Sequence, residues 1–346
     1  MLSGAYTRTA SLLCVLSMLI VLAFVMDIMY GSISLSIEEV WRALVYGDEQ
    51  ASSTYIIRNF RLPKALTALF AGAGIAIAGL QMQSLFHNPL ADTSILGINS
   101  GAGVGVAMYT MAYSLFPSVA IWNSGVAVWG VIISACLGSA IVLLLIAMVA
   151  SRVHSIVSVL IVGVMVGFLA SAIISILQFF SDEETLKTYL LWSFGSVTGT
   201  TWKQLYVLLP IITTGLCLAL MMPKPMNALA LGERYAHSVG INVSFTRFAL
   251  IGITSLLAGS ITAFTGPIAF LGLAVPHFVR ILFKTSDHRI LIPATMLVGA
   301  LLLLVCDLLT QVPGKGMTLP INALTSLIGA PVVIAIIIRN HRSNQL

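Results

Sequence analysis

Long apolar runs dominate the chain, and short polar connections separate them. The runs are about twenty residues long and do not alternate between apolar and polar positions, so they predict membrane-spanning helices rather than the strands of a barrel. A span must be a helix or part of a closed barrel, because backbone amides without hydrogen-bond partners are costly in hydrocarbon. About ten spans are expected, near residues 10–30, 62–85, 93–113, 120–150, 154–180, 201–222, 244–264, 266–283, 290–311 and 320–338.

At Thr265-Gly266-Pro267 the pattern allows two readings: a break between two spans, or one bent span. The two halves of the chain also resemble each other, because each has a Gly-rich span followed by a turn that contains a histidine, His87 or His277. Five spans in each half would give the halves opposite orientations, as in the inverted repeats of many transporters. The expected fold is an all-α polytopic membrane protein made of two five-helix halves.

Composition supports a membrane location. The chain is 58% hydrophobic and only 8% charged, with a mean hydropathy of +1.02 over 346 residues. A soluble domain carries roughly 25% charged residues.

The apolar segment that follows Arg8 is long for a signal peptide and lacks a small-residue cleavage site, so we expect a retained first helix. The four cysteines lie far apart inside apolar runs, without metal-binding spacing, so we expect them in the core and expect no metal or cofactor in this chain.

Lys and Arg residues in the connections indicate the orientation. With the N-terminus in the cytoplasm, ten basic residues face the cytoplasm and seven face outward, which favours cytoplasmic N- and C-termini. Arg58, Arg61 and Lys64 are an exception, because they cluster at the outer end of the second span. They are either interfacial residues whose aliphatic stems lie along lipid, or a docking patch for an acidic partner.

Catalytic motifs are missing. The chain has no G-x-x-x-x-G-K-[ST], H-E-x-x-H or G-x-S-x-G sequence, so we expect neither nucleotide hydrolysis nor another enzyme activity. Asp27 and Asp307 lie near predicted span ends, where water or a neighbouring helix can satisfy them. Few other carboxylates lie near the spans. This argues against a secondary transporter driven by an ion gradient, which remains the alternative to the function given below.

Four ordered segments carry a family resemblance. They are Arg61-Leu62-Pro63-Lys64 with the following stretch 87–103, the loop 226–240, the stretch 266–277 with Asp287-His288-Arg289, and the stretch 319–331. Together they resemble the FecCD family of ABC-importer permeases, which includes vitamin B12, ferric-siderophore and haem permeases. The resemblance extends from about residue 58 to residue 339.

The resemblance implies a single transmembrane permease domain, 1–346, in a bacterial inner membrane. It also implies a homodimer, two cytoplasmic ATPase subunits that bind ATP-Mg, and one extracytoplasmic binding protein. Nucleic acid is not among the implied partners. The implied substrate is a metal chelate; a ferric siderophore is favoured, and haem or cobalamin is the alternative.

The resemblance also implies site residues at the outer surface. Residues that pair with glutamates of the binding protein correspond to Arg58, Arg61, Lys64 and Lys315. The chain has Gln311 where the family often has another Arg, and Lys315 is the proposed replacement. The stretch 184–194 resembles a short helix that lines the outer mouth.

At the cytoplasmic side, the loop 224–243 resembles the segment that couples the permease to its ATPase; a solvated loop is the alternative. The gate residues implied by the resemblance could instead be ordinary turn and cap residues. Glu233 near a helix start and Gly240 at a helix stop fit the local physical chemistry. The coupling residues are Met226, Leu231, Gly232, Glu233, Arg234, Ala236 and Gly240. The gate residues are Asn88, Pro89, Leu90, Ser155, Ile156 and Val157.

Overall fold

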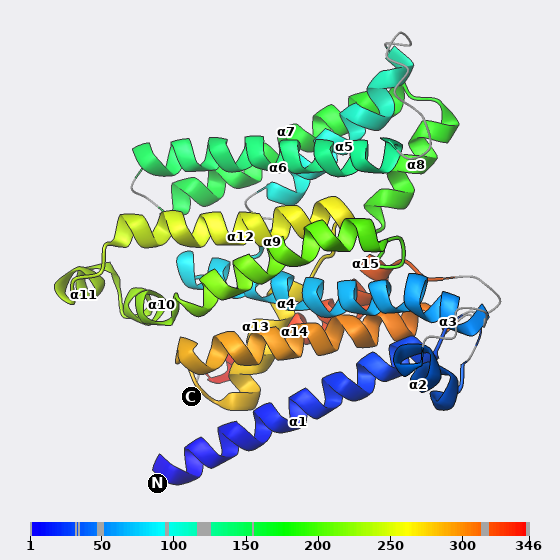
Figure 1. Cartoon of the computed structure of the whole chain (residues 1–346). Helices are drawn as coiled ribbons and strands as arrows, with labels where there is room; N and C mark the ends of the chain where they lie inside the picture. The colour runs from blue at the N-terminus through cyan, green and yellow to red at the C-terminus, as the bar shows by residue number, and fades with distance from the viewer. Residues whose placement is uncertain are drawn as a thin grey trace. The chain divides into compact units, whose positions relative to one another are not determined.

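The computed structural model describes residues 2–31, 33, 35–46, 52–93, 97–115, 126–153, 156–312 and 318–343. Helices form almost all of these ranges (Figure 1), and no strand occurs within them. The prediction of an all-α fold is therefore confirmed.

The chain folds as two compact units, and each unit takes segments from both predicted halves. The first unit comprises Met1–Ile77, Ser196–Pro223 and Ala269–Leu346. Its elements are α1 (Leu2–Met29), α2 (Ile37–Val45), α3 (Ser52–Ile56), the π-helical turn η1 (Ile57–Arg61), the first part of α4 (Leu62–Leu85), α9 (Trp202–Leu220), α13 (Leu271–Phe283), α14 (His288–Thr310) and α15 (Ile321–Ser343).

The second unit comprises Ala78–Gly195 and Lys224–Ile268. Its elements are the end of α4, α5 (Ile98–Leu115), α6 (Val126–Arg152), α7 (Ile156–Phe179), α8 (Glu183–Ser193), α10 (Pro223–Ala230, which begins at the boundary), α11 (Glu233–Ser238) and α12 (Val243–Thr265). The α8 helix coincides with the short helix expected at 184–194. The inverted relation of the two halves and the single permease domain stay predictions.

Small residues bring helices close together within each unit. In the first unit α4 packs on α14 at Gly72, where a Cβ would collide with the carbonyl oxygen of Gly299. In the second unit α5 packs on α6 at Gly101, where a Cβ would lie 2.6 Å from the oxygen of Gly138. Helix association in a membrane depends on this close packing, because lipid provides no hydrophobic drive between apolar helices.

Each of the ten predicted spans overlaps a helix in the described ranges, but the count of ten spans is not confirmed. Seven helical segments among the described residues are long and apolar enough to cross a membrane: Thr7–Met29, Ser52–Leu85, Val128–Val149, Val157–Phe179, Trp202–Leu220, Val243–Thr265 and His288–Thr310. The predicted break at Gly266-Pro267 is confirmed. The α12 helix ends at Thr265, Gly266 has φ +72° and Phe270 has φ +65°, so the backbone leaves the helical conformation before α13 begins.

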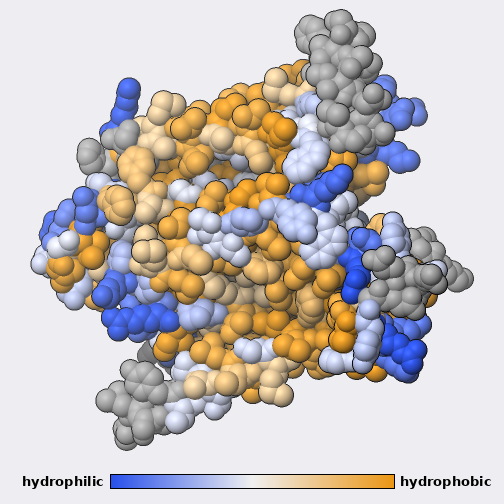
Figure 2. All heavy atoms as spheres, in the orientation of Figure 1, coloured by the Kyte–Doolittle hydropathy of each residue, from blue (hydrophilic) through white to orange (hydrophobic). Residues whose placement is uncertain are grey.

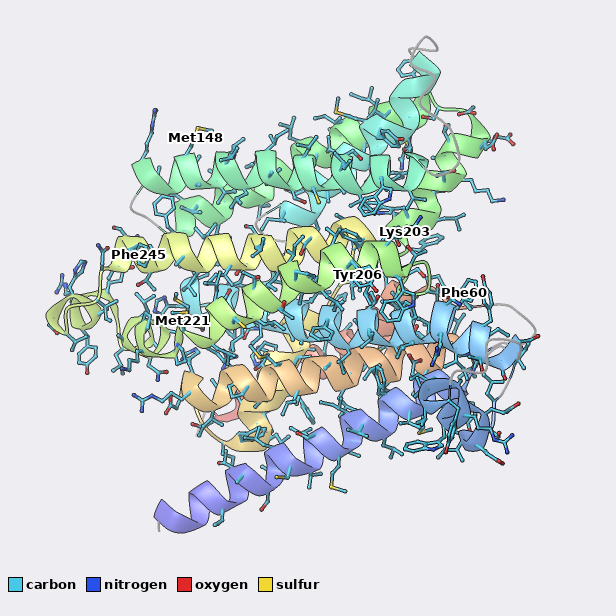
Figure 3. The ribbon with its side chains drawn as sticks, in the orientation of Figure 1. Phe60, Met148, Lys203, Tyr206, Met221 and Phe245 are labelled. Carbon is cyan, nitrogen blue, oxygen red and sulfur yellow. The ribbon has the colours of Figure 1, made fainter. Side chains whose placement is uncertain are left out.

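The helix surfaces suit a lipid environment. Hydrophobic residues cover the lengths of the helices in Figure 2, and hydrophilic residues gather near the helix ends. Large apolar side chains such as Met148 and Phe245 point outward (Figure 3). On α6 the exposed residues Ile133, Leu137, Ile141 and Leu144 recur at helical spacing. The chain is thus a multi-pass membrane protein.

Candidate functional site

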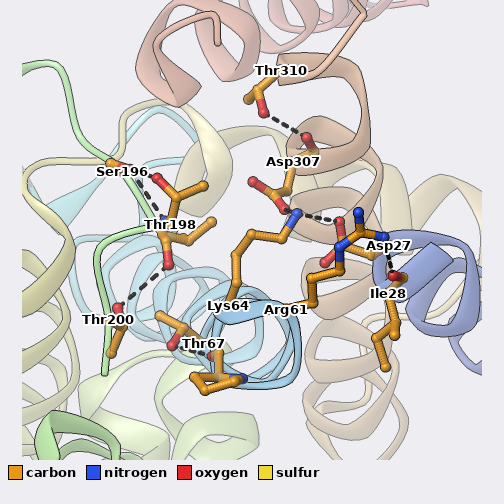
Figure 4. Close-up of polar contacts among 12 residues, drawn as sticks. Asp27, Ile28, Arg61, Lys64, Thr67, Ser196, Thr198, Thr200, Asp307 and Thr310 are labelled. Atoms are coloured by element: carbon orange, nitrogen blue, oxygen red, sulfur yellow. Dashed lines mark hydrogen bonds and ion pairs between the residues drawn. The ribbon is translucent and has the colours of Figure 1, made fainter. Parts of the chain in front are cut away.

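A buried cluster of charges joins α1, α4 and α14 within the first unit (Figure 4). The Nζ atom of Lys64 lies 3.0 Å from Oδ1 of Asp27 and 2.7 Å from Oδ2 of Asp307. Lys64 is only 5% exposed, and both aspartates are almost fully buried. A buried ammonium needs such partners, because an isolated charge in a low-dielectric interior is strongly disfavoured.

Arg61 completes the cluster from the preceding turn, since residues three apart share one helix face. Its guanidinium donates hydrogen bonds to the carbonyl oxygens of Ile28 at 2.6 Å, Met29 at 2.7 Å, and Ile33. The carbonyls at a helix end have no partner within the helix and carry a partial negative charge, so a cation there is stabilised. Arg61 therefore caps the C-terminal end of α1.

Two cations and two carboxylates thus occupy one site, and their formal charges cancel. The cluster joins three helices at one end through the contacts of Lys64 and Arg61. Within α14, the Thr310 hydroxyl donates a 2.6 Å hydrogen bond to the main-chain oxygen of Asp307. Lys64 contacts one oxygen of each aspartate, the Oδ2 atom of Asp27 is buried without a hydrogen-bond partner, and all of these groups are shielded from solvent. The geometry therefore fits a helix clamp and not a centre for acid–base or nucleophilic chemistry.

The expectation that Arg61 and Lys64 form an accessible docking patch is wrong for this conformation. Arg61 is 6% exposed and Lys64 is 5% exposed, because carbonyl oxygens accept hydrogen bonds from Arg61 and two carboxylates pair with Lys64 inside the unit. Arg58 is half-buried, and its guanidinium donates to the Ala43 oxygen at 2.9 Å. Lys315 lies outside the described residues.

Sequence reasoning missed the pairing of Asp27 and Asp307 with Lys64. Both aspartates were expected near span ends, with a neighbouring helix as one way to satisfy them, but the helix was not identified. The available signal was that an ionisable residue in a span almost always has a partner. Two acidic residues and a basic residue near span ends were therefore candidates for one cluster.

The predicted coupling residues lie in and directly around a pair of short helices in the second unit, α10 and α11, beyond the start of α12 in Figure 1. Gly232, with φ +108°, turns the chain between them, and Glu233 begins α11 and forms an ion pair with Arg247 of α12. Gly240, with φ +82°, follows the end of α11, where the Ile241 amide donates to the Ala236 oxygen at 2.9 Å. The predicted start and stop of the helix are thus confirmed.

The two helices have distinct faces. Met226 and Ala236 are fully buried inside the second unit. Leu231 is 68% exposed, and Tyr235 and Val239 are also exposed. Arg234 lies on the exposed side as well. The helix pair therefore presents a mixed apolar and charged outer surface.

The predicted gate residues lie in two places. Asn88, Pro89 and Leu90 form a tight turn after α4, in which the Asn88 Oδ1 atom accepts a 2.9 Å hydrogen bond from the Leu90 amide. Ile156 begins α7 and Val157 is exposed, whereas Ser155 lies outside the described residues. The structure brings the 88–90 turn to the coupling helices through His87, whose Nε2 atom lies 2.8 Å from the Leu229 oxygen of α10.

No three His, Cys, Asp or Glu residues come together in the described part of the chain. The expectation that the four cysteines lie in the core is wrong for three of them: Cys14, Cys136 and Cys217 are exposed, and Cys306 is buried.

Polar pairs inside the second unit are hydrogen-bonded to each other. Thr254 donates to Gln81 at 3.0 Å, and Thr262 donates to Asn99 at 3.1 Å. Such pairs stabilise helix contacts within a membrane.

Comparison with known proteins identifies related chains. Residues 19–339 match the FecCD transport family. The hemin transport system permease protein HmuU of Yersinia pestis is 33% identical over 317 residues, which cover 91% of each chain. The vitamin B12 import system permease protein BtuC of Klebsiella pneumoniae subsp. pneumoniae is 34% identical over 292 residues, covering 84% of this chain and 85% of the relative. A solved structure, described as an inward-facing conformation of a putative metal-chelate type ABC transporter, superposes with a TM-score of 0.83 at 30% identity, over 95% of this chain and 99% of that one.

Proposed function

This chain belongs to the FecCD transport family, and we propose that it is the membrane-spanning subunit of an ATP-driven importer. In this proposal two copies form the translocation path, two cytoplasmic ATPase subunits supply energy, and an extracytoplasmic binding protein delivers the substrate. ATP hydrolysis belongs to the partner subunits. The proposed location is a bacterial inner membrane, with both termini in the cytoplasm.

The observation that carries the proposal is the outer surface of α10 and α11. Leu231, Tyr235 and Val239 are exposed there next to Glu233 and Arg234. The charged residues keep this surface out of the hydrocarbon, so lipid does not account for the exposed apolar groups. An exposed apolar patch with a polar rim is typical of a protein–protein interface. In the proposed ATP-driven importer, the partner at this surface is an ATPase subunit on the cytoplasmic side.

The proposed substrate is a metal chelate. The names of two relatives refer to hemin and vitamin B12, and the solved relative is described as a metal-chelate type transporter. These names support haem and cobalamin at least as well as the ferric siderophore favoured by sequence analysis. All three therefore belong in the transport assay.

The residues proposed to contact the binding protein differ from those expected from sequence. Arg61 and Lys64 are engaged in the helix clamp, so we assign them to helix packing. Arg58 and Lys315 stay predicted contacts with the binding protein. Arg58 is the better defined of the two, because it is half-buried near the clamp and its main-chain oxygen accepts a 2.7 Å hydrogen bond from Trp202.

The test is reconstitution with the cognate ATPase and binding protein. The tagged permease is expected to retain the ATPase during purification, and proteoliposomes should take up haem, cobalamin or a ferric siderophore only with ATP. Substitution of Leu231 by Asp should abolish ATPase retention, because a charge replaces an exposed apolar contact. Uptake driven by an ion gradient without the ATPase would instead support the secondary-transporter alternative.

A further inference from the structure

We propose that His87 is a positioning residue that links the α10–α11 helices to the predicted gate turn 88–90. The inference rests on the proposed function, because it concerns how movement of the coupling helices reaches the gate. Three features of the second unit support it: the backbone conformation of His87, the hydrogen bond of its side chain, and the rigidity of the adjoining turn.

His87 occupies a backbone position that favours glycine. It has φ +48°, and the Asn88 amide reaches back to the Gln83 oxygen at 3.2 Å, which closes the end of α4. The end of α11 is closed in the same way, and there the left-handed residue is Gly240. A residue with a side chain is disfavoured in this conformation by roughly 1 kcal/mol or more. Glycine would adopt this turn at a lower conformational cost than histidine. The turn therefore does not explain why a histidine side chain is present.

The imidazole provides that explanation. Its Nε2 atom lies 2.8 Å from the Leu229 oxygen, and because a carbonyl only accepts, the proton lies on Nε2. The same oxygen accepts a 2.9 Å hydrogen bond from the Gly232 amide, at the turn between α10 and α11. Both lone pairs of the Leu229 carbonyl are thus used. The His87 contact therefore falls at the joint of the coupling helices.

Packing makes this joint responsive to movement of the helices. Leu229 is only 2% exposed and precedes Leu231 by two residues in the chain. Leu231 is on the outer surface proposed to contact the ATPase. A displacement of the outer surface therefore carries the Leu229 carbonyl with it. A hydrogen bond is directional, so the imidazole follows this movement or the bond breaks.

The turn after His87 is rigid enough to pass the displacement on. Asn88 holds it twice, since Oδ1 accepts from the Leu90 amide at 2.9 Å and the main-chain oxygen accepts from the Ala91 amide at 3.0 Å. Pro89 fixes its own φ between them. A rotation at His87 therefore moves Leu90 as part of one body.

The experiment compares three substitutions of His87 in the complete permease–ATPase complex. His87→Gly removes the imidazole and relaxes the backbone, so the complex should stay folded and ATPase activity should remain. Uptake per ATP hydrolysed is expected to fall roughly two- to tenfold, the effect of one lost hydrogen bond. His87→Asn tolerates the backbone conformation but is too short to reach Leu229, so it should match His87→Gly. His87→Gln can donate a hydrogen bond and should restore most of the coupling.

Wild-type uptake per ATP in the His87→Gly complex would overturn the inference. An equal loss in His87→Gln and His87→Gly would also overturn it, because the hydrogen bond would then not be the cause. Thermal unfolding of each complex serves as the control for folding. Failure of the proposed function gives a different result, since the wild-type permease would then show no ATP-dependent uptake at all.

Discussion

Replacement of Lys64 by methionine tests the helix clamp most directly. Methionine keeps the length and most of the volume of the side chain but removes the ammonium. Asp27 and Asp307 would then face each other without the cation that lies 3.0 Å from one and 2.7 Å from the other. Arg61 cannot replace the lost charge, because its guanidinium is engaged with carbonyl oxygens at the end of α1.

The expected loss of stability follows from burial. Removal of one partner from a buried ion pair destabilises a protein by about 3–5 kcal/mol, because the remaining charge is left uncompensated. The double variant Lys64→Met/Asp307→Asn removes one charge of each sign, so the formal charge of the cluster stays as in the wild type. It should be more stable than Lys64→Met by at least about 1 kcal/mol, since contacting residues do not contribute additively.

The measurement is the free energy of unfolding in mixed micelles, by denaturant titration of the purified permease. Lys203→Met is the matched control, because Lys203 is exposed at the start of α9 (Figure 3) and its replacement should change stability by no more than about 0.5 kcal/mol. A Lys64→Met variant within about 1 kcal/mol of the wild type would refute the clamp. A double variant less stable than Lys64→Met would refute the charge-balance argument.

Three further predictions concern other contacts. Arg61→Lys should destabilise the permease by about 1–3 kcal/mol in the same titration, because one ammonium cannot reproduce the fork of donors at the end of α1; an unchanged midpoint would contradict this capping role. Gly138→Ala should destabilise by about 1–3 kcal/mol, since the new Cβ would collide with the Gly101 oxygen, whereas Gly252→Ala meets no atom within 4 Å and should be nearly neutral. Leu231→Asp should leave the unfolding midpoint unchanged and remove the ATPase from the purified complex, and retention of the ATPase would exclude Leu231 from that interface.

Much of the fold could be predicted from sequence because its determinants are local. The length and hydrophobicity of a segment decide whether it forms a span, and each of the ten predicted segments overlaps a helix among the described residues. The break at Gly266-Pro267 was predictable for the same reason, since Pro lacks an amide donor and Gly adopts positive φ. Glu233 and Gly240 marked the limits of α11 through helix-end chemistry. The small helices α2 and α3 were missed, although α2 has a capping box at its start, Ser36 with Glu39 three residues later.

The division into compact units was not predictable in this way. Each unit combines segments that are distant in sequence, and α4 contributes to both. Helix surfaces rich in small residues allow many close pairings, and the sequence pattern does not specify which pairing occurs. Gly72 against Gly299 and Gly101 against Gly138 are the pairings that form.

The sequence by itself determined that this protein lies in a membrane, which segments form its long helices, and which family it resembles. Tertiary structure decided whether its charged side chains face outward or pair with other buried groups. Arg61 and Lys64 look from sequence like an outward-facing basic patch, yet the structure turns them inward toward α1 and α14. The physical reason is that a charge near a span end is stable in water or beside an opposite buried charge. Only the packing of distant helices decides which of these is present.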